Sequence, residues 1–263
     1  MRLLLVFAAL VPVGVFFLLQ SHVAAQSPDG AQQMLTANQL YEDAEYVESA
    51  NVYQQLVGQG YTNVRLYHNL GNAYYKRGEL GRALVNYLRA QRLSPRDADV
   101  KANLELARSQ TVEKLDLKRA PLFTRLSLVT VPWMTFNETA LATVATWYLL
   151  AVTFAALVLM RRKGPRKAVF SLVLVFLLMF GTVSIIFGSR SYAVATGERG
   201  VIVAKTTEFS SGPGTNYKRL STLHEGAEAR VLARRGSWTK IELFDAGRQG
   251  WVEARAVEAV GIP

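Results

Sequence analysis

Two asparagines and two basic residues stand at a spacing of four, three and four positions: Arg65, Asn69, Asn72 and Lys76. On an α-helix this spacing places all four side chains on one stripe of the surface. Guanidinium, ammonium and amide groups together can grip a peptide backbone or a terminal carboxylate. The chemistry indicated is therefore the binding of a peptide or protein. The alternative, that these are solvated polar residues without a ligand, stays open.

The predicted binding set extends beyond this stripe. His68 and Tyr75 adjoin it on the same segment, and Asn103, on a later helical segment, could face the same groove. The full candidate set for peptide or protein binding is Arg65, His68, Asn69, Asn72, Tyr75, Lys76 and Asn103.

No pattern for catalysis accompanies this set. The three histidines, His22, His68 and His224, fall in three different parts of the chain and cannot form a metal cluster within one of them. The absence of cysteine excludes disulfides, thiolate metal sites and a cysteine nucleophile. Neither a Gly-x-Ser-x-Gly elbow nor a phosphate-binding loop occurs. We therefore expect a protein that is not an enzyme and uses no metal or cofactor.

The stripe lies within a 34-residue pattern over Val64–Asp97. Aromatic, small and turn residues stand there at the offsets of a tetratricopeptide unit: Tyr67, Leu70, Gly71, Tyr74, Gly78, Ala83, Tyr87, Ala90 and Pro95. The small residues let two helices approach closely, and the proline ends the second helix. We predict an all-α tetratricopeptide repeat domain over residues 26–120, with its best repeat at 64–97.

The neighbouring segments complete this helical domain. A weaker copy of the pattern runs from about Ala31 to Gly58. After Pro95, Asp97 can cap a closing helix from Ala98 to about Leu115. Such short arrays need a capping element to cover their last apolar face. We therefore expect two helical hairpins and one closing helix.

The period changes after Tyr192. Strand-like runs, separated by glycine-containing or polar turns, suggest a small β-barrel over residues 192–263: Gly200–Ala204, Ala227–Ala233, Trp238–Phe244 and Gly250–Glu253. Residues Ser210–Tyr217 contain a Ser-Gly-Pro-Gly run, and Leu223–Gly226, Trp238 and Gly250–Val252 follow it. This order resembles bacterial SH3-like domains, although the usual Leu-Asn-Val-Arg lead-in is replaced by Thr207–Ser210.

The resemblance implies two uses for the barrel. Some relatives bind cell-wall peptides, and many serve only for attachment. The candidate ligand contacts are Tyr217, Trp238 and Trp251. For the two tryptophans we favour the alternative, a place in the barrel core.

The N-terminal 25 residues have the features of a secretory signal peptide. Arg2 precedes the apolar run Leu3–Leu19, and Val23-Ala24-Ala25 supplies small residues for cleavage after Ala25. An uncleaved membrane anchor is the alternative. Either outcome sends the chain from Gln26 onward across the membrane.

Two further apolar runs, 140–160 and 168–187, carry no charge and are long enough to be transmembrane helices. Five of the seven residues between them, 161–167, are Arg or Lys, which marks a cytoplasmic loop, and its Gly164-Pro165 pair allows a tight hairpin. Both flanking domains are then extracytoplasmic, in agreement with the signal peptide. We expect residues 121–139 to form an interfacial linker at the membrane surface.

The net charge of +10 reflects this topology. Residues 26–120 carry 12 Lys and Arg against 11 Asp and Glu, and residues 192–263 carry 10 against 8. The remaining positive charge flanks the apolar runs, so we predict no nucleic-acid partner.

The run Leu70–Leu84, with Leu93–Asp97 and Asn103-Leu104, is more specific than a general repeat consensus. It resembles the BatE (Bacteroides aerotolerance) tetratricopeptide proteins, which have the same order of signal, repeats, paired spans and SH3-like domain. The resemblance implies a bacterial inner-membrane protein, multi-pass, with both soluble domains periplasmic. It also implies partners that are von Willebrand A-domain membrane proteins, in a system that includes a MoxR-type ATPase.

Three functions are compatible with these features. We favour a membrane-anchored scaffold for protein–protein interactions in a cell-envelope complex that acts in envelope stress or protein maturation. The alternatives are an envelope sensor whose SH3-like barrel binds peptidoglycan, and a regulatory subunit of a periplasmic hydrolase.

Overall fold

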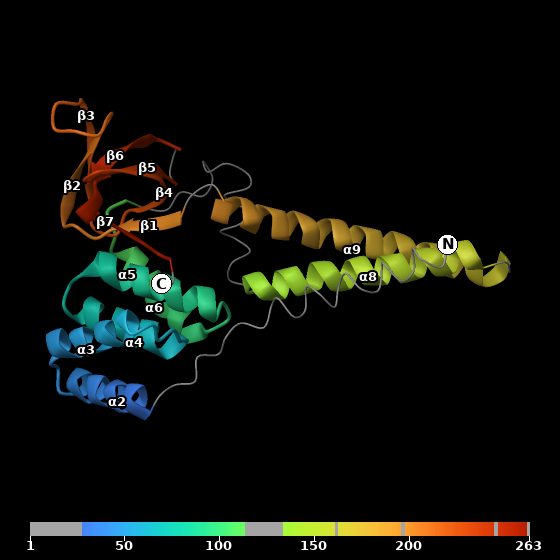
Figure 1. The fold of residues 1–263 in the computed structure, drawn as a ribbon, viewed down its shortest axis with the longest axis horizontal. Helices are drawn as coiled ribbons and strands as arrows, with labels where there is room; N and C mark the ends of the chain where they lie inside the picture. The colour runs from blue at the N-terminus through green and yellow to red at the C-terminus, as the bar shows by residue number, and fades with distance from the viewer. Residues whose placement is uncertain (1–27, 114–133, 161–162, 196–197, 245–246, 262–263) are drawn as a thin grey trace. The chain divides into compact units, whose positions relative to one another are not determined.

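The computed structural model describes residues 28–113, 134–160, 163–195, 198–244 and 247–261 (Figure 1). These residues fall into two compact units. One unit holds two long apolar helices, and the other holds five shorter helices and a seven-stranded sheet. The predicted signal peptide, most of the predicted linker and the end of the predicted repeat domain lie outside the described residues.

The five shorter helices form two antiparallel hairpins and a closing helix, as expected. The first hairpin is α2 (Pro28–Glu42) with α3 (Tyr46–Gly58), and the second is α4 (Val64–Lys76) with α5 (Leu80–Leu93). The closing helix, α6, spans Ala98–Ser109 and so ends earlier than the predicted end near Leu115.

Side-chain caps fix where two of these helices begin. The Asn63 side chain accepts a hydrogen bond from the Leu66 amide at the start of α4. The Asp97 side chain accepts from the amides of Asp99 and Val100 at the start of α6, which confirms the predicted cap. Each cap satisfies amides that the first helical turn leaves without a partner.

Buried tyrosines and small residues hold the hairpins together. Tyr53 and Tyr87 are at most 2% exposed, and each lies in the core that joins the helices. A Cβ on Gly71 would lie 2.6 Å from the ring of Tyr87, so only glycine fits there. The predicted role of this glycine, close approach of two helices, is confirmed.

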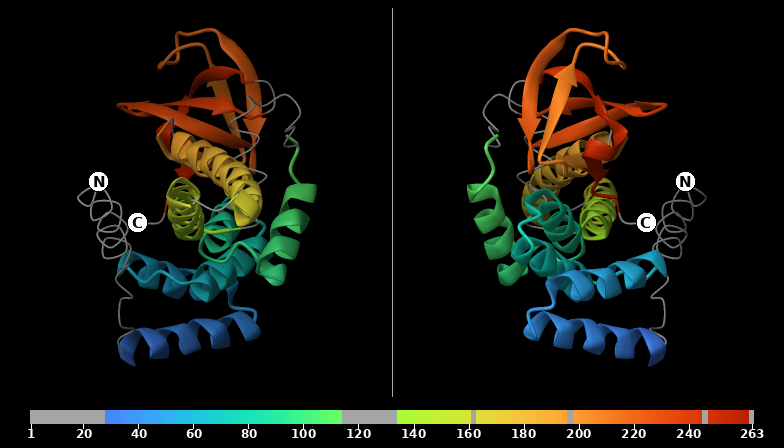
Figure 2. Two further views of the ribbon diagram at one scale, coloured as in Figure 1. Left: turned by 90° about the vertical axis from the view of Figure 1, so that its right-hand side faces the viewer. Right: turned by 90° about the vertical axis from the view of Figure 1, so that its left-hand side faces the viewer.

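The C-terminal part is one antiparallel sheet with the strand order β3-β2-β6-β5-β4-β1-β7, and the sheet curls on itself (Figure 2). Ten of its buried residues form an apolar core of their own. The strands are β1 (Glu198–Ile202), β2 (Thr206–Ser210), β3 (Arg219–His224), β4 (Glu228–Arg235), β5 (Trp238–Leu243), β6 (Gln249–Glu253) and β7 (Val257–Ala259). A 3-10 turn over Ala254–Ala256 separates the last two strands. The Ser-Gly-Pro-Gly run connects β2 to β3. The strands β2, β3 and β7 were not among the strands predicted from the sequence.

The sheet and the five helices belong to the same compact unit. Helix α5 packs against β1 and β7. Val201 on β1 and Val260, which directly follows β7, are at most 1% exposed and belong to the same apolar core as the helices. The two parts therefore share a core rather than meeting only at their surfaces.

The second unit contains α8 (Phe136–Leu159) and α9 (Lys163–Ala195). Both helices are long and apolar enough to span a membrane, and few side chains in their most apolar stretches are buried. Helix α9 begins at Lys163, so Gly164 and Pro165 lie in its first turn, where proline is tolerated, and not in a loop as expected. The start of α8 contacts the last turns of α9. Arg190 donates to Thr139 at 3.0 Å, and the rings of Phe136 and Phe187 are 5.4 Å apart.

Candidate functional site

Four asparagine side chains form hydrogen-bonded pairs across α2, α4 and α6. Asn69 donates from Nδ2 to Oδ1 of Asn38 at 3.0 Å, which joins α4 to α2. Asn103 donates from Nδ2 to Oδ1 of Asn72 at 2.9 Å, which joins α6 to α4. The structure thus brings together three residues of the predicted binding set and adds Asn38, which sequence reasoning did not single out as a site residue.

Two buried tyrosines donate hydrogen bonds to these asparagine pairs. The Tyr53 hydroxyl donates to Oδ1 of Asn38 at 2.6 Å, and the Tyr87 hydroxyl donates to Oδ1 of Asn72 at 2.9 Å. Burial raises the pKa of both hydroxyls, so they stay protonated and remain donors. We call these six residues the asparagine ladder: Asn38, Tyr53, Asn69, Asn72, Tyr87 and Asn103.

The ladder repeats with the period of the sequence pattern. Asn72, Tyr87 and Asn103 follow Asn38, Tyr53 and Asn69 by 34 positions each. Both halves make the same two hydrogen bonds over the same sequence separations, 15 and 31 positions. Shifting the predicted site residues back by one repeat would have identified Asn38 from the sequence.

The ladder limits which atoms can meet a ligand. Oδ1 of Asn38 and Oδ1 of Asn72 each accept two hydrogen bonds, which fills their acceptor capacity. Their Nδ2 groups and Oδ1 of Asn69 have no hydrogen bond within the described residues. The tyrosines fix the orientation of these groups, which reduces the entropy lost when a ligand binds.

A pocket of about 270 Å³ opens beside the first half of the ladder. Its lining residues are Asn38, Tyr41, Glu42, Tyr53, Asn69 and Asn72. Arg65 and Lys76 are exposed and are not among them. Two of the predicted binding residues are therefore on the surface of α4 but outside the pocket.

The remaining predicted residues of the helical part have partners within the protein. Asn103 donates to Nε2 of His68 at 2.9 Å. Burial lowers the pKa of His68, so its ring is neutral and can accept this bond. The Tyr75 hydroxyl accepts from Nε2 of Gln110 at 2.5 Å. These contacts stabilise the closing helix α6 against α4.

The two tryptophans of the sheet are not in its core, so our favoured interpretation of them was wrong. Ile241 on β5 and Val252 on β6 face inward and belong to the core. Trp251 pairs with Lys240 across the two strands, on the opposite face. Both tryptophans are partly exposed there, and Tyr217 is 53% exposed on the β2–β3 loop.

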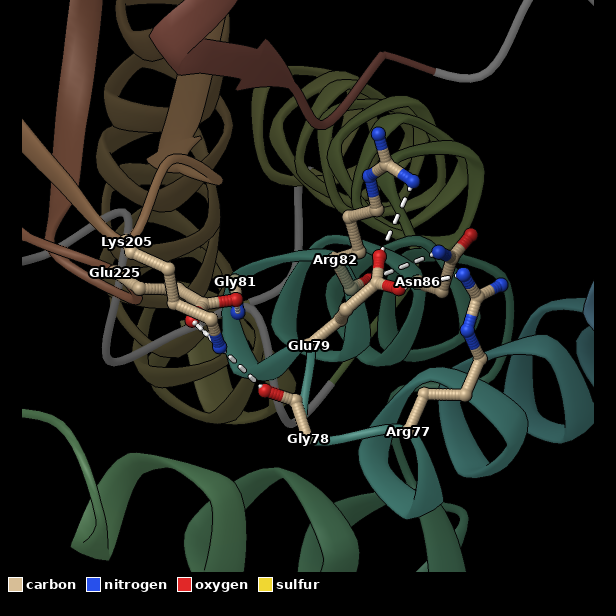
Figure 3. A network of polar contacts seen from close by, with 8 residues as sticks. All are labelled: Arg77, Gly78, Glu79, Gly81, Arg82, Asn86, Lys205 and Glu225. Atoms are coloured by element: carbon tan, nitrogen blue, oxygen red, sulfur yellow. Dashed lines mark hydrogen bonds and ion pairs between the residues drawn. The ribbon is translucent and has the colours of Figure 1, made fainter. Parts of the chain in front are cut away.

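A polar contact joins the start of α5 to the sheet (Figure 3). Glu225 accepts from the Gly81 amide at 3.0 Å and from Nζ of Lys205 at 2.6 Å. Lys205 also donates to the Gly78 carbonyl at 2.7 Å. A Cβ on Gly81 would lie 2.3 Å from the carbonyl oxygen of Ile202, so this close approach requires glycine.

Glu228 forms a second, buried link. Its carboxylate accepts from Nε of Arg108 on α6 at 2.7 Å and is also hydrogen-bonded to Arg199 on β1. The side chain of Glu228 is 4% exposed, while those of Arg108 and Arg199 are 27% and 17% exposed. Burial alone would raise the pKa of this carboxyl, but the two guanidinium groups outweigh it and hold the pKa below its usual value.

Two arginines of α5 hold the end of the sheet. Arg89 donates to the carbonyls of Gly261 and Ala259 at 3.1 and 2.9 Å, and Arg92 donates to the Val260 carbonyl at 3.2 Å. These bonds satisfy carbonyls at and beyond an edge strand that would otherwise need water. Together with the Glu225 and Glu228 links, they fix the sheet against the helices.

Among the described residues, no group of three or more His, Asp or Glu side chains could hold a metal ion. The arrangement can make hydrogen bonds, ion pairs and aromatic contacts with a ligand.

Comparison with known proteins places only the C-terminal part in a family. Residues 211–258 match the bacterial SH3 domain, and the curled antiparallel sheet agrees with this match. The protein therefore carries a bacterial SH3 domain, packed on a set of antiparallel helices and combined with two apolar helices. No curated protein matches the chain.

Proposed function

We propose that this protein is a non-enzymatic, membrane-anchored scaffold whose asparagine ladder binds an extended segment of a partner protein. The observation that carries the proposal is the ladder itself, which presents oriented amide groups on one face of the helices. Side-chain amides that are already held in place are well suited to bond the donors and acceptors of a peptide backbone.

The 34-residue spacing of the ladder supports a tetratricopeptide identity for the helical part. On the resemblance to BatE proteins, we propose that the partners are von Willebrand A-domain membrane proteins of a bacterial cell envelope. The five basic residues within 161–167, where the first apolar helix gives way to the second, support an orientation with the five shorter helices and the SH3 domain outside the cytoplasm.

The shared core gives the scaffold a second property. The SH3 domain is fixed against α5 and α6 by the Glu225 and Glu228 links. A partner bound at the ladder would therefore be held at a set distance from whatever the SH3 domain contacts.

Affinity capture from gently solubilised membranes tests this function. We compare the unaltered full-length protein with Asn69→Ala, which removes the unused acceptor Oδ1 of Asn69 from the pocket without leaving a buried tyrosine unpaired. The matched control is Asn51→Ala, an exposed position on α3 that is not in the ladder. We expect von Willebrand A-domain proteins to be captured by the unaltered protein and the control, and lost with Asn69→Ala. Equal capture by all three would exclude the ladder as the binding surface.

The outward tryptophans favour one second candidate, an envelope sensor that binds peptidoglycan through the SH3 domain. Partly exposed aromatic rings on an outer sheet face are suited to contact a ligand. Sedimentation of the full-length protein with purified cell wall, compared with Trp251→Ala, tests it. Binding that survives moderate salt and is lost in the variant would support the sensor, and no binding would count against it.

A further inference from the structure

The pocket beside the ladder is lined by hydrogen-bond acceptors and a carboxylate. Its unused acceptors are Oδ1 of Asn69, the Tyr41 hydroxyl and the Glu42 carboxylate, which makes no hydrogen bond or ion pair within the described residues. Glu42 lies close enough to Tyr53 to raise the pKa of that hydroxyl further, after burial and the effect of Tyr41. Among the residues that the structure describes, no Lys or Arg side chain lines the pocket.

The surrounding hairpin has the same sign of charge. Helices α2 and α3 and their connecting turn carry five acidic residues and no Lys or Arg: Asp29, Glu42, Asp43, Glu45 and Glu48. The negative potential of this hairpin attracts a cation toward the pocket and repels a carboxylate.

The size of the pocket suits one side chain. Its volume of about 270 Å³ lies just below the usual range of pockets for small-molecule ligands, which begins at about 300 Å³. Unused amide hydrogens of Asn38 and Asn72 lie at the same pocket and can donate to the carbonyls of a peptide backbone.

We propose that the pocket binds the side chain of an arginine or lysine carried on an extended segment of the partner protein. The Glu42 carboxylate and Oδ1 of Asn69 accept from the cation, and the amides of Asn38 and Asn72 hold the adjoining backbone. The proposal rests on the scaffold function above and adds the chemistry of the segment recognised. It also decides between two ligands that the sequence left open, because a terminal carboxylate would meet Glu42 and no cation.

Peptide binding to the full-length protein in detergent tests this specificity. The probes are fluorescein-labelled, end-capped nonapeptides of alanine and serine with a central arginine, citrulline or glutamate, followed by fluorescence polarisation. Citrulline keeps the shape of arginine but has no charge. We expect the arginine peptide to bind about fivefold more tightly than the citrulline peptide, the scale of a partly solvated ion pair, and the glutamate peptide to bind more weakly than both.

A matched pair of variants assigns the preference to the pocket. Glu42→Gln should bind the arginine and citrulline peptides equally, because it removes the carboxylate in the pocket. Glu48→Gln makes the same charge change at an exposed position of α3 outside the pocket and should keep the preference. The proposal is overturned if no peptide binds, if arginine and citrulline bind equally to the unaltered protein, or if the two variants lose the preference to the same degree.

The outcome is separable from that of the scaffold function. Loss of partner capture in Asn69→Ala together with equal binding of the arginine and citrulline peptides would keep the scaffold and remove the cation preference. Unchanged capture in Asn69→Ala, with no peptide bound, would remove both.

Discussion

Replacing Glu228 by glutamine tests whether the helices and the SH3 domain fold as one unit. The substitution keeps the shape of the side chain but leaves the guanidinium groups of Arg108 and Arg199 without their carboxylate. Removing one partner of a buried ion pair costs about 3–5 kcal/mol. Because both arginines keep some contact with solvent, we expect the lower end, about 3 kcal/mol.

The assay is thermal unfolding of the full-length protein in detergent, followed by circular dichroism. For a unit of this size, 1 kcal/mol corresponds to about 2–4 °C in melting temperature, so Glu228→Gln should lower it by roughly 6–12 °C. The control is Glu208→Gln, whose ion pair with Arg219 is 3.4 Å long and more than half exposed on both sides. A change in Glu228→Gln no larger than in this control would refute the role of Glu228 as a structural link.

The Glu228 links also predict how the stability of the protein changes with pH. The pKa of the Glu228 carboxyl is lower in the folded protein than its ordinary value of 4.5. Its contribution to stability is therefore complete above about pH 4.5 and is lost as the pH falls through the lowered pKa. Glu228→Gln should accordingly lose less stability than the unaltered protein when both are acidified.

Two further predictions concern the contact between α5 and the sheet, and the ladder. Gly81→Ala should separate the sheet from α5, because the new Cβ would meet the carbonyl oxygen of Ile202. Proteolysis should then cleave between the helices and the sheet more quickly. The control is Gly58→Ala, where nothing lies within 4 Å of the new Cβ, and it should cause no such change. Tyr87→Phe should lower stability by about 1 kcal/mol in chemical unfolding, because Asn72 loses one donor, and should also weaken capture of the partner. Unchanged capture of the partner or unchanged stability in Tyr87→Phe would contradict its role in orienting the ladder.

Local signals in the sequence predicted much of the helical part. The Asp97 cap and the close approach at Gly71 depend on neighbours within one hairpin, so residue type and spacing reveal them. The links through Glu225 and Glu228 were not predicted, because their helical partners lie 144 and 120 positions away. No periodic pattern records a contact over such a separation.

The error on the tryptophans had a different cause. In Trp238–Leu243 partly exposed and buried residues alternate, and Ile241 is on the face opposite to Trp238. The strand period of two therefore predicts an outward Trp238, whereas we relied on the general tendency of tryptophan to be buried. The sequence analysis named Lys76 on α4 as a candidate, and it did not single out Glu42, which lines the pocket next to the asparagine ladder.

The arginine contacts between α5 and the last strand also set an order of assembly. Arg89 bonds the Ala259 carbonyl, 170 positions later in the chain, and Val260 completes the core of the helices. At about 5–20 residues per second, synthesis of that stretch takes roughly 10–35 s. During this interval the apolar side of α5 has no cover from the sheet, and the two apolar helices between must emerge first. Completion of the helical core therefore depends on delivery of the C-terminal strand to the same compartment, so a chain stopped before Val257 would be an exposed substrate for chaperones and proteases.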